Sequence, residues 1–423
     1  MNTIEQTFRD RTPASAVHAA AASVVMPGGD TRAAAHHPPY QLTMVMGEGP
    51  WLTDLDGNRY LDLIGNFTSL VHGNAYPPIV AAARDAISLG SNWPARNLHA
   101  VALAEEIVSL VPSVDQVRFT NSGSEATMLA VEIARAATGR RLVLMARYGY
   151  HGSAPHFEVG TQGHEGPETL LATYGDAGSF EAVLAERGAE VAAVILEPVM
   201  GAGGLAAATP DFLERVEQAA HAAGALLILD EVITLRLSVG GAQGSLGVRP
   251  DLTAMGKIIG GGFPVGAVGG REDLMALCNP AQPRLYHSGT FNGNPVTTAA
   301  GLVSLRHLTA DRIELMAAQA GALDAVLAKA AAELGLPLTV RREGSMLQLF
   351  FSPSAPAATP LRTDGAEITA FHLAALNRGV FLAPRGLLAL STVHDDDLID
   401  EAGQRLCAAM EDLAGEDLAT EPH

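Results

Sequence analysis

Two residues in this chain have the chemistry to activate an amine. Lys257 lies in Gly256-Lys257-Ile258-Ile259-Gly260, where small and apolar neighbours would let its amine reach an aldehyde. Asp230 follows the apolar run 226–229, and a carboxylate at such a strand end can hold a protonated ring nitrogen. These are the two groups that pyridoxal phosphate (PLP) requires. Since a single lysine is usually a solvated surface charge, the surrounding motifs have to decide the interpretation.

A glycine- and serine-rich junction offers a place for the phosphate of such a cofactor. Residues 121–126 read Asn-Ser-Gly-Ser-Glu-Ala and join an expected strand to an expected helix. The first amides of a helix favour an anion, and the hydroxyls of Ser122 and Ser124 add donors beside Gly123. The same pattern is also an ordinary helix cap, so it supports phosphate binding only in company with the other motifs.

Aromatic and acidic residues at further strand ends could contact a planar ring. Tyr150 could stack on one face of the ring, and Val232 could pack against the opposite face. Glu197 and Asp230 end neighbouring expected strands, so their carboxylates are expected to point into one crevice. His151 could act as a base, although the sequence shows no partner for it.

Strands and helices alternate from about residue 117 onward, which indicates a mostly parallel sheet covered on both faces. Ligands of such sheets bind beyond the carboxyl ends of the strands, where these motifs lie. Beyond residue 295 helices dominate, and the chain end predicts a smaller α+β domain. The expected strands are 42–46, two within 51–64, 117–120, 142–145, 191–196, 226–229, 267–270 and 346–351. The expected helices are one early within 13–40, then 80–89, 98–111, 125–138, 180–187, 210–223, 297–308, 313–334, 368–377 and 396–413; residues 352–360 are expected to form a loop.

Composition narrows the classes of protein further. A chain of 423 residues with 48% hydrophobic residues can bury more than one core, which suggests two domains. The net charge of −19 disfavours nucleic acid and anionic membranes as partners. Cys278 and Cys407 form no CxxC pair, no residue set has metal-ligand spacing, and no secretory signal or apolar run of about twenty residues stands out. We therefore expect a cytoplasmic protein without a metal site.

The motifs are more informative as an ordered set than singly. Taken together they resemble the class III PLP-dependent aminotransferases, in particular the branch of glutamate-1-semialdehyde aminomutase and the β-amino-acid (β-phenylalanine-type) aminotransferases. The resemblance covers about residues 26–410 and rests on NSGSEA at 121–126, YHG at 150–152, EPV at 197–199, DEV at 230–232, GKIIGGGFPVGA at 256–267 and GTFNGNP at 289–295.

The resemblance implies an α/β fold, the PLP-dependent transferase fold type I. It has a large domain whose mostly parallel seven-stranded sheet is sandwiched by helices, and a smaller α+β domain. We expect an N-terminal segment over 1–70, the large PLP-binding domain over 71–300 and the small domain over 301–423. Family members are homodimers with active sites at the subunit interface.

The same resemblance implies roles for individual residues. Lys257 would form the imine with PLP and later move a proton, and Asp230 would bind the pyridine nitrogen. Ser122, Gly123 and Ser124 would hold the phosphate, and Thr290 would reach the phosphate of the neighbouring subunit. Tyr150, His151, Glu197 and Val232 complete the expected cofactor contacts. One departure from the family is Arg236, which stands in Ile-Thr-Leu-Arg-Leu where many members have a Gly-x-Gly-Arg-type stretch.

Two arginines are candidates for binding a substrate carboxylate, since guanidinium groups bind carboxylates through paired hydrogen bonds. Arg32 follows Met-Pro-Gly-Gly-Asp-Thr, which resembles the entry segment of this branch, and Arg385 precedes Gly386 in a stretch that resembles the β-amino-acid aminotransferases. The resemblance thus favours transfer of an amino group from a β-amino acid to a keto acid such as 2-oxoglutarate or pyruvate, in two half-reactions through the Lys257 imine.

Three alternatives stay open at this point. A glutamate-1-semialdehyde-type aminomutase would move the amine within one molecule and need no second keto acid. A regulator or scaffold built on the same fold would need an added binding domain, and the sequence shows no basic helix-turn-helix segment. A nucleotide-binding enzyme is disfavoured because the chain has neither a GxGxxG opening a first βαβ unit nor a GxxxxGK[ST] motif.

Overall fold

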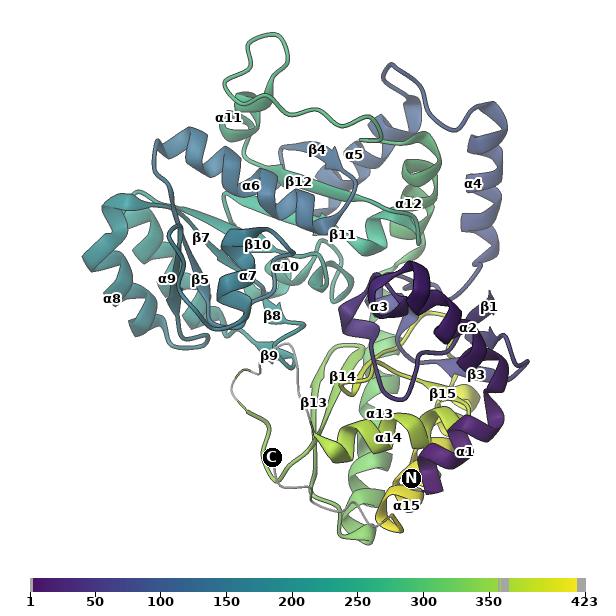
Figure 1. Ribbon diagram of the computed structural model, residues 1–423. Coiled ribbons are helices and arrows are strands. Elements are labelled where there is room, and N and C mark those ends of the chain that lie inside the picture. Colours follow the sequence, from purple (N-terminus) through teal and green to yellow (C-terminus); the bar gives the residue numbers. More distant parts are fainter. Residues whose placement is uncertain (1–2, 357, 359–364, 417–423) are drawn as a thin grey trace. The chain divides into compact units, whose positions relative to one another are not determined.

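A computed structural model describes residues 3–356, 358 and 365–416 (Figure 1). The chain divides into two compact units. Unit 1 comprises the described residues among 1–76, 314–356 and 362–423, and unit 2 comprises 77–313 together with Ala358. The N-terminal segment therefore belongs to the same unit as the end of the chain.

Unit 2 is built on a seven-stranded sheet in the order β4-β12-β11-β10-β7-β5-β6. Only β12 runs antiparallel to its neighbours β11 and β4, and the other strands share one direction. The predicted seven-stranded, mostly parallel sheet is thereby confirmed. Its strands are β4 (Gln116–Thr120), β5 (Leu142–Ala146), β6 (Thr169–Ala172), β7 (Val191–Leu196), β10 (Leu226–Asp230), β11 (Leu252–Gly256) and β12 (Gly266–Gly270).

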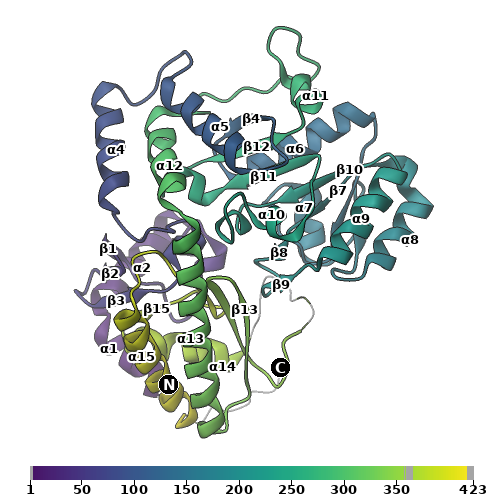
Figure 2. The ribbon, with the colours of Figure 1, turned by 180° about the vertical axis from the view of Figure 1, so that it is seen from behind.

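Helices cover both faces of this sheet (Figures 1 and 2). Alternate residues of one strand enter different cores: Leu144 of β5 packs with α8 and α9, whereas Val143 packs with α6. Because both faces are buried, the strands read as nearly continuous apolar runs. The helices of unit 2 are α4 (Pro77–Leu89), α5 (Leu98–Leu110), α6 (Gly123–Thr138), α7 (Pro155–Thr161), α8 (Ala177–Arg187), α9 (Pro210–Ala222), α10 (Ala242–Leu246), α11 (Glu272–Met275) and α12 (Pro295–His307).

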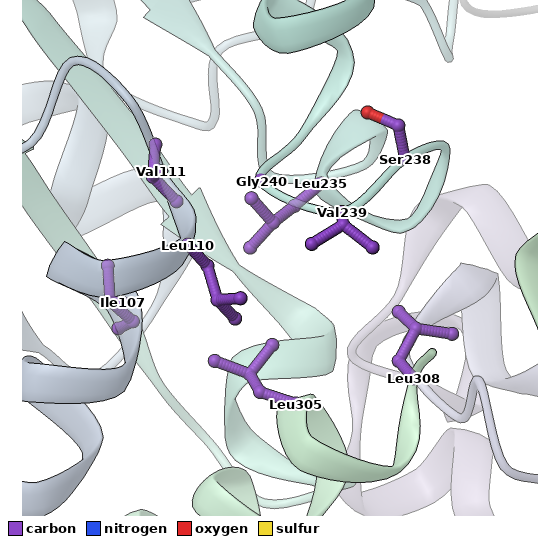
Figure 3. Close-up of a pocket in the computed structure, with 9 residues that line it drawn as sticks. All are labelled: Ile107, Leu110, Val111, Leu235, Ser238, Val239, Gly240, Leu305 and Leu308. Atoms are coloured by element: carbon purple, nitrogen blue, oxygen red, sulfur yellow. The ribbon is translucent and has the colours of Figure 1, made fainter. Parts of the chain in front are cut away.

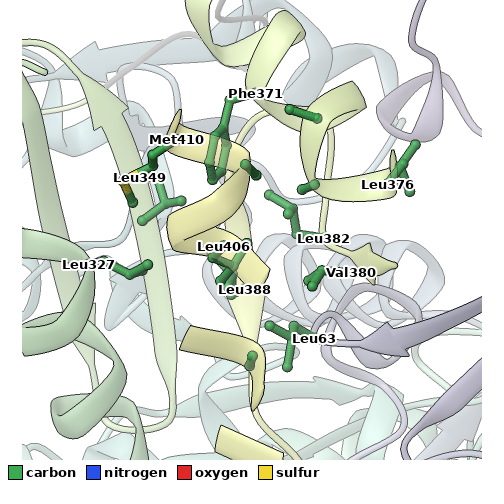
Figure 4. Packing of buried hydrophobic residues seen from close by; sticks show 14 of the residues in the cluster. Leu63, Leu327, Leu349, Phe371, Leu376, Val380, Leu382, Leu388, Leu406 and Met410 are labelled. Atoms are coloured by element: carbon green, nitrogen blue, oxygen red, sulfur yellow. The ribbon is translucent and has the colours of Figure 1, made fainter. Parts of the chain in front are cut away.

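Unit 1 contains two small sheets and the helices that pack on them. One sheet has the order β1-β2-β3-β15 and the other β13-β14-β16. Their shared core includes Leu63, Leu327, Phe371, Leu406 and Met410 (Figure 4). The strands are β1 (Met44–Glu48), β2 (Trp51–Asp54), β3 (Arg59–Asp62), β13 (Leu338–Glu343), β14 (Met346–Phe351), β15 (Val380–Phe381) and β16 (Leu387–Ala389). The helices are α1 (Thr3–Arg11), α2 (Pro13–Val25), the single turn α3 (Gly65–Thr68), α14 (Ala366–Asn377) and α15 (Asp396–Ala414).

Helix α13 (Ala310–Leu334) carries the chain from unit 2 into unit 1. This helix is long and apolar enough to cross a membrane, but core helices of globular proteins often have the same length and composition. Within unit 1 its buried residues Met316, Ala320, Leu323 and Leu327 recur every three or four positions, as on the core-facing side of an amphipathic helix.

The structure differs from the sequence-based expectations at several elements. Strands β6, β11 and β13 and helices α1 and α7 were not predicted, and α6 begins at Gly123 rather than at residue 125. Strand β11 escaped prediction because its sequence, Leu-Thr-Ala-Met-Gly, is short and ends in glycine, and neither a strand nor a helix period stands out in it. It matters most, because it leads directly into Lys257.

Candidate active site

The carboxyl ends of four strands bring most of the predicted site residues to one edge of the unit 2 sheet. Asp230 ends β10 and pairs with Ala254 of β11, and Lys257 follows β11 directly. Glu197 follows β7, the other neighbour of β10. Gly266 of β12 pairs with Gly256 at the end of β11 and with Thr120 at the end of β4. The start of α6 therefore lies next to Gly256, and a Cβ atom on Gly256 would lie 3.4 Å from Cα of Gly123.

Asp230 is buried and makes two hydrogen bonds that fix its carboxylate. Its Oδ2 lies 2.9 Å from Nδ1 of His151, and its Oδ1 accepts a hydrogen bond of 3.1 Å from the amide of Val232. His151 is itself buried, and its Nε2 has no hydrogen-bond partner among the described residues. Asp230 is therefore the hydrogen-bond partner of His151, which the sequence did not reveal. The imidazole of His151 fixes the orientation of the Asp230 carboxylate.

Glu197 fixes the backbone on which Tyr150 stands. Its Oε1 accepts a hydrogen bond of 3.0 Å from the amide of Tyr150, and its Oε2 accepts one of 2.9 Å from the amide of Gly201. Burial raises the pKa of Glu197 to about 7, while nearby His151 opposes that rise. Tyr150 as a whole remains 39% exposed, so it is accessible to a ligand.

The junction predicted to hold phosphate forms the start of α6. Ser122 caps the helix, because its hydroxyl accepts a hydrogen bond of 3.1 Å from the amide of Glu125. Glu125 also accepts a hydrogen bond of 2.9 Å from the amide of Asn121, the residue before the cap, which further fixes the junction. The amides of Gly123 and Ser124 are the first of the helix, where no intrahelical carbonyl can reach them. Such a start binds anions well.

Glycines bring three segments into close contact beside this helix start. A Cβ atom on Gly123 would lie 2.9 Å from both Cγ atoms of Val232, and one on Gly256 would lie 3.3 Å from Cγ1 of Val232. A larger residue at either glycine would push Val232 aside. Val232, the helix start and the strand that precedes Lys257 therefore converge.

Lys257 has an unusual backbone conformation for a non-glycine residue, with φ of +51°. Left-handed residues of this kind cost free energy and are held in place by their surroundings, often at functional sites. The chain contains only one other lysine, Lys329, which lies on α13 with its side chain 78% exposed. Of the two amines, only that of Lys257 stands at the strand ends of the sheet.

Thr290 lies on the exposed segment between η6 (Ala276–Cys278) and α12. Its carbonyl accepts a hydrogen bond of 2.9 Å from Nδ2 of Asn92, and Nδ2 of Asn121 reaches Oδ1 of Asn292 at 2.8 Å. The segment is thus tied to the phosphate-binding junction. Its predicted contact, with a neighbouring subunit, concerns a second chain and stays a prediction.

Arg32 and Arg385 both belong to unit 1. Arg32 is exposed, and its Nη1 donates a hydrogen bond of 2.7 Å to Oδ1 of Asn66. Arg385 is half-buried in the tight turn between β15 and β16, where Gly386 has φ of +86° and the amide of Gly386 donates to the carbonyl of Ala383.

Two further charged groups near the site were not assigned a role by the sequence. Glu231 is fully buried and accepts hydrogen bonds from the amides of Ala242 and Gln243, at 3.0 and 2.8 Å, and from the hydroxyl of Thr234. Burial raises the pKa of Glu231. Arg236 is the largest fully buried side chain of the described residues, and burial lowers its pKa to about 10. Glu231 anchors the loop that carries Arg236, so we interpret both as structural.

A separate hollow opens between the end of α5, the loop after η4 (Thr234–Arg236) and the end of α12 (Figure 3). Its lining is aliphatic apart from the hydroxyl of Ser238 and the backbone of Gly240. It contains no titratable side chain and therefore offers no acid–base or nucleophilic chemistry, in contrast to the strand ends.

Comparison with known proteins agrees with the geometry of the strand ends. The family model described as aminotransferase class-III matches residues 32–410. The chain belongs to the class-III aminotransferase family. The family predicted from the sequence motifs is thereby confirmed.

Similar proteins fall into both expected branches. The chain is 42% identical to a glutamate-1-semialdehyde 2,1-aminomutase from Thermomicrobium roseum, over 88% of this chain and 91% of that protein. It is 38% identical to a β-phenylalanine transaminase from Variovorax paradoxus, over 93% of this chain and 92% of that protein. The crystal structure of an ω-transaminase from Sphaerobacter thermophilus superimposes with a TM-score of 0.90 at 36% identity, covering 95% of this chain and 98% of that one.

The cofactor of the family is PLP, and this class-III chain uses it. The residues present suit that molecule: an amine and a carboxylate stand at adjoining strand ends, a helix start offers free amides, and glycines let Val232 pack closely against that helix start and the strand before Lys257. PLP supplies an aldehyde carbon and a ring that accepts electrons when it is bound.

Proposed function

We propose that the protein is an aminotransferase that takes the amino group of a β-amino acid, or a related carboxylate-bearing amine, and passes it to a keto acid such as 2-oxoglutarate or pyruvate. The observation that carries the proposal is the convergence of Lys257 and Asp230 at adjoining strand ends of β11 and β10. The similarity to a β-phenylalanine transaminase over 93% of the chain supports the donor class.

Each side chain of the site has a role in this proposal. The amine of Lys257 holds the aldehyde of the resting cofactor and, once released, takes the proton from the donor carbon and delivers it. The carboxylate of Asp230 keeps a proton on the ring nitrogen, and His151 keeps that carboxylate in place through the 2.9 Å hydrogen bond. By keeping that proton in place, Asp230 and His151 would make proton removal from the donor easier.

The remaining contacts orient the cofactor. Ser122, Gly123 and Ser124 at the start of α6 would bind the phosphate, and Val232 and Tyr150 would pack on the ring. Glu197 acts through the backbone of Tyr150, whose amide it binds.

Arg32 and Arg385 bind carboxylate groups in the proposed reaction. The donor has one carboxylate, and 2-oxoglutarate has two, so paired guanidinium contacts suit both halves of the cycle. We further propose a homodimer in which Thr290 reaches the phosphate of the partner subunit. Tyr286 and Phe291, on the same segment, leave 85% and 61% of their surface exposed, as residues of an interface would in a single chain.

An aminomutase is the second candidate, favoured by the 42% identity to a glutamate-1-semialdehyde 2,1-aminomutase. Half-reactions followed by absorbance distinguish the two. Mixing the PLP-loaded protein with β-phenylalanine alone should build up the pyridoxamine phosphate form, and pyruvate or 2-oxoglutarate should restore the PLP form. The Lys257→Ala variant should show neither change.

The opposite pattern would contradict the proposal. If β-phenylalanine and other carboxylate-bearing amines leave the spectrum unchanged, while glutamate-1-semialdehyde is isomerised without any keto acid, the protein is an aminomutase. If no amine changes the spectrum of the loaded protein, it is neither enzyme.

A further inference from the structure

The turn Gly65–Thr68 winds in the left-handed direction, which is rare for L-amino acids. Its four residues have φ of +53°, +47°, +53° and +74°, and three of them are not glycine. In a left-handed turn Cβ crowds the following carbonyl oxygen, so single left-handed residues are uncommon and consecutive ones rarer still. Such a conformation persists only where the surroundings impose it, and it is frequent at ligand sites.

A buried carboxylate holds the start of this turn from inside unit 1. One oxygen of Asp62 accepts hydrogen bonds from the amides of Ile64 and Gly65, at 3.1 and 2.9 Å, and the other accepts one of 2.9 Å from Nδ2 of Asn74. The amide of Leu70 closes the turn on the carbonyl of Gly65 at 2.9 Å. The turn is therefore held at both ends.

The turn presents Asn66 to Arg32. Both side chains are exposed, and Nη1 of Arg32 donates a hydrogen bond of 2.7 Å to Oδ1 of Asn66. The acidic residue closest in sequence, Asp30, uses its Oδ1 for the amides of Thr31 and Arg32. Within the described part of the chain no carboxylate forms an ion pair with Arg32, so its charge is not neutralised.

An amide is well suited to this position. As a neutral acceptor it fixes the guanidinium without cancelling its positive charge, whereas a carboxylate would compete with a substrate. Nη2 of Arg32 has no hydrogen-bond partner within the described residues, so a carboxylate can bind there. Asparagine is also one of the few residues that tolerate the left-handed conformation.

We propose that Asn66 is a positioning residue for Arg32, and that the left-handed turn exists to hold it there, so that the protein prefers amines that carry a carboxylate. This inference rests on the proposed function, in which Arg32 binds the carboxylate of the donor. Asn66 itself does not contact the reacting atoms; it acts by restricting the guanidinium.

The test uses the PLP-loaded full-length protein and the single-turnover half-reaction with β-phenylalanine. Asn66→Gly keeps the left-handed backbone accessible and removes the amide, and Ser69→Ala is the matched control. The hydroxyl of Ser69 donates to the carbonyl of Asn66 at 2.9 Å in the same turn and has no hydrogen bond to Arg32. We expect Asn66→Gly to raise the donor concentration for half-maximal rate about tenfold, the scale of one hydrogen bond to a charged group, with the maximal rate unchanged.

Two more variants test the route of the effect. Asn66→Asp should raise the half-maximal concentration further, because its carboxylate occupies Arg32. Arg32→Ala should raise it at least as much as Asn66→Gly, and adding Asn66→Gly to Arg32→Ala should change nothing more, since coupled residues are not additive.

The outcomes separate this inference from the proposed function. If Arg32→Ala leaves the half-maximal concentration unchanged, the carboxylate role in the proposed function fails. If Arg32→Ala raises the half-maximal donor concentration but Asn66→Gly does not, the role of Asn66 is wrong and that of Arg32 stands. The same conclusion follows if Asn66→Gly has its full effect in the Arg32→Ala background. An equal effect of Ser69→Ala would show that the turn is only structural.

Discussion

The buried carboxyl group of Glu197 should make the stability of unit 2 depend on pH near neutrality. Its side chain accepts hydrogen bonds from the amides of Tyr150 and Gly201 and is almost inaccessible to solvent. Burial raises its pKa from 4.5 to about 7. In the range between these two values the folded protein keeps a proton that the unfolded chain releases.

The sign follows from this proton balance. The contribution of Glu197 is fully present below pH 4.5 and is lost as the pH rises through about 7. The difference between these two pKa values, at 1.36 kcal/mol per pH unit, corresponds to about 3 kcal/mol. Glu197→Gln keeps the shape of the side chain but cannot ionise, so this pH dependence should disappear in the variant.

Native-state hydrogen exchange of the amides in β7 and β10 measures the effect where Glu197 lies. The free energy of opening of the wild type, relative to Glu197→Gln, should fall by about 3 kcal/mol between pH 4.5 and pH 8. Glu186→Gln, at an exposed position on α8, is the control and should show no such difference. A difference between wild type and Glu197→Gln that stays constant across this range would refute the reasoning.

Two further predictions follow from the geometry. Asp230→Asn removes the charge that holds the ring proton, and loss of one partner of a buried charge pair costs about 3–5 kcal/mol. The turnover number should therefore fall at least about 100-fold. A loss of less than about tenfold in steady-state kinetics would contradict the assignment of Asp230. Burial lowers the pKa of His37 in unit 1 to about 4. Below pH 6.5 the unfolded chain therefore binds a proton that the folded chain does not, and unit 1 should lose about 3 kcal/mol by pH 4. Hydrogen exchange of the amides in β3 should detect this loss of stability. The His37→Asn variant should lose less, whereas the control His36→Asn, at an exposed position, should lose as much as the wild type. Equal acid sensitivity of all three proteins would contradict the role of His37.

Strand ends made much of the site predictable from the sequence. Asp230 and Glu197 each follow an apolar run, the junction at Ser122 follows a short strand, and parallel strands bring such ends to one edge of a sheet. The order of the motifs then indicated the family, which the comparisons confirm. Local sequence and topology were sufficient for this part because backbone hydrogen bonds determine which strand ends meet.

Long-range side-chain contacts were not predictable in the same way. The pairing of His151 with Asp230 depends on how the loop after β5 folds back over β10, and no local pattern encodes that path. The start of the left-handed turn at Asn66 is held by Asp62, which Asn74 binds in turn, so the residues of the turn alone give no signal beyond Gly65. Such features depend on packing across the unit rather than on local propensity.

The chain's two lysines make a direct test of the central claim feasible. Reduction of the PLP-loaded protein with borohydride, followed by digestion and mass spectrometry, locates the amine that holds the cofactor. We predict that the reduced cofactor is attached to the peptide containing Lys257 and is absent from the peptide containing exposed Lys329. Attachment at Lys329, or a protein that gains no mass on reduction, would contradict the assignment of Lys257.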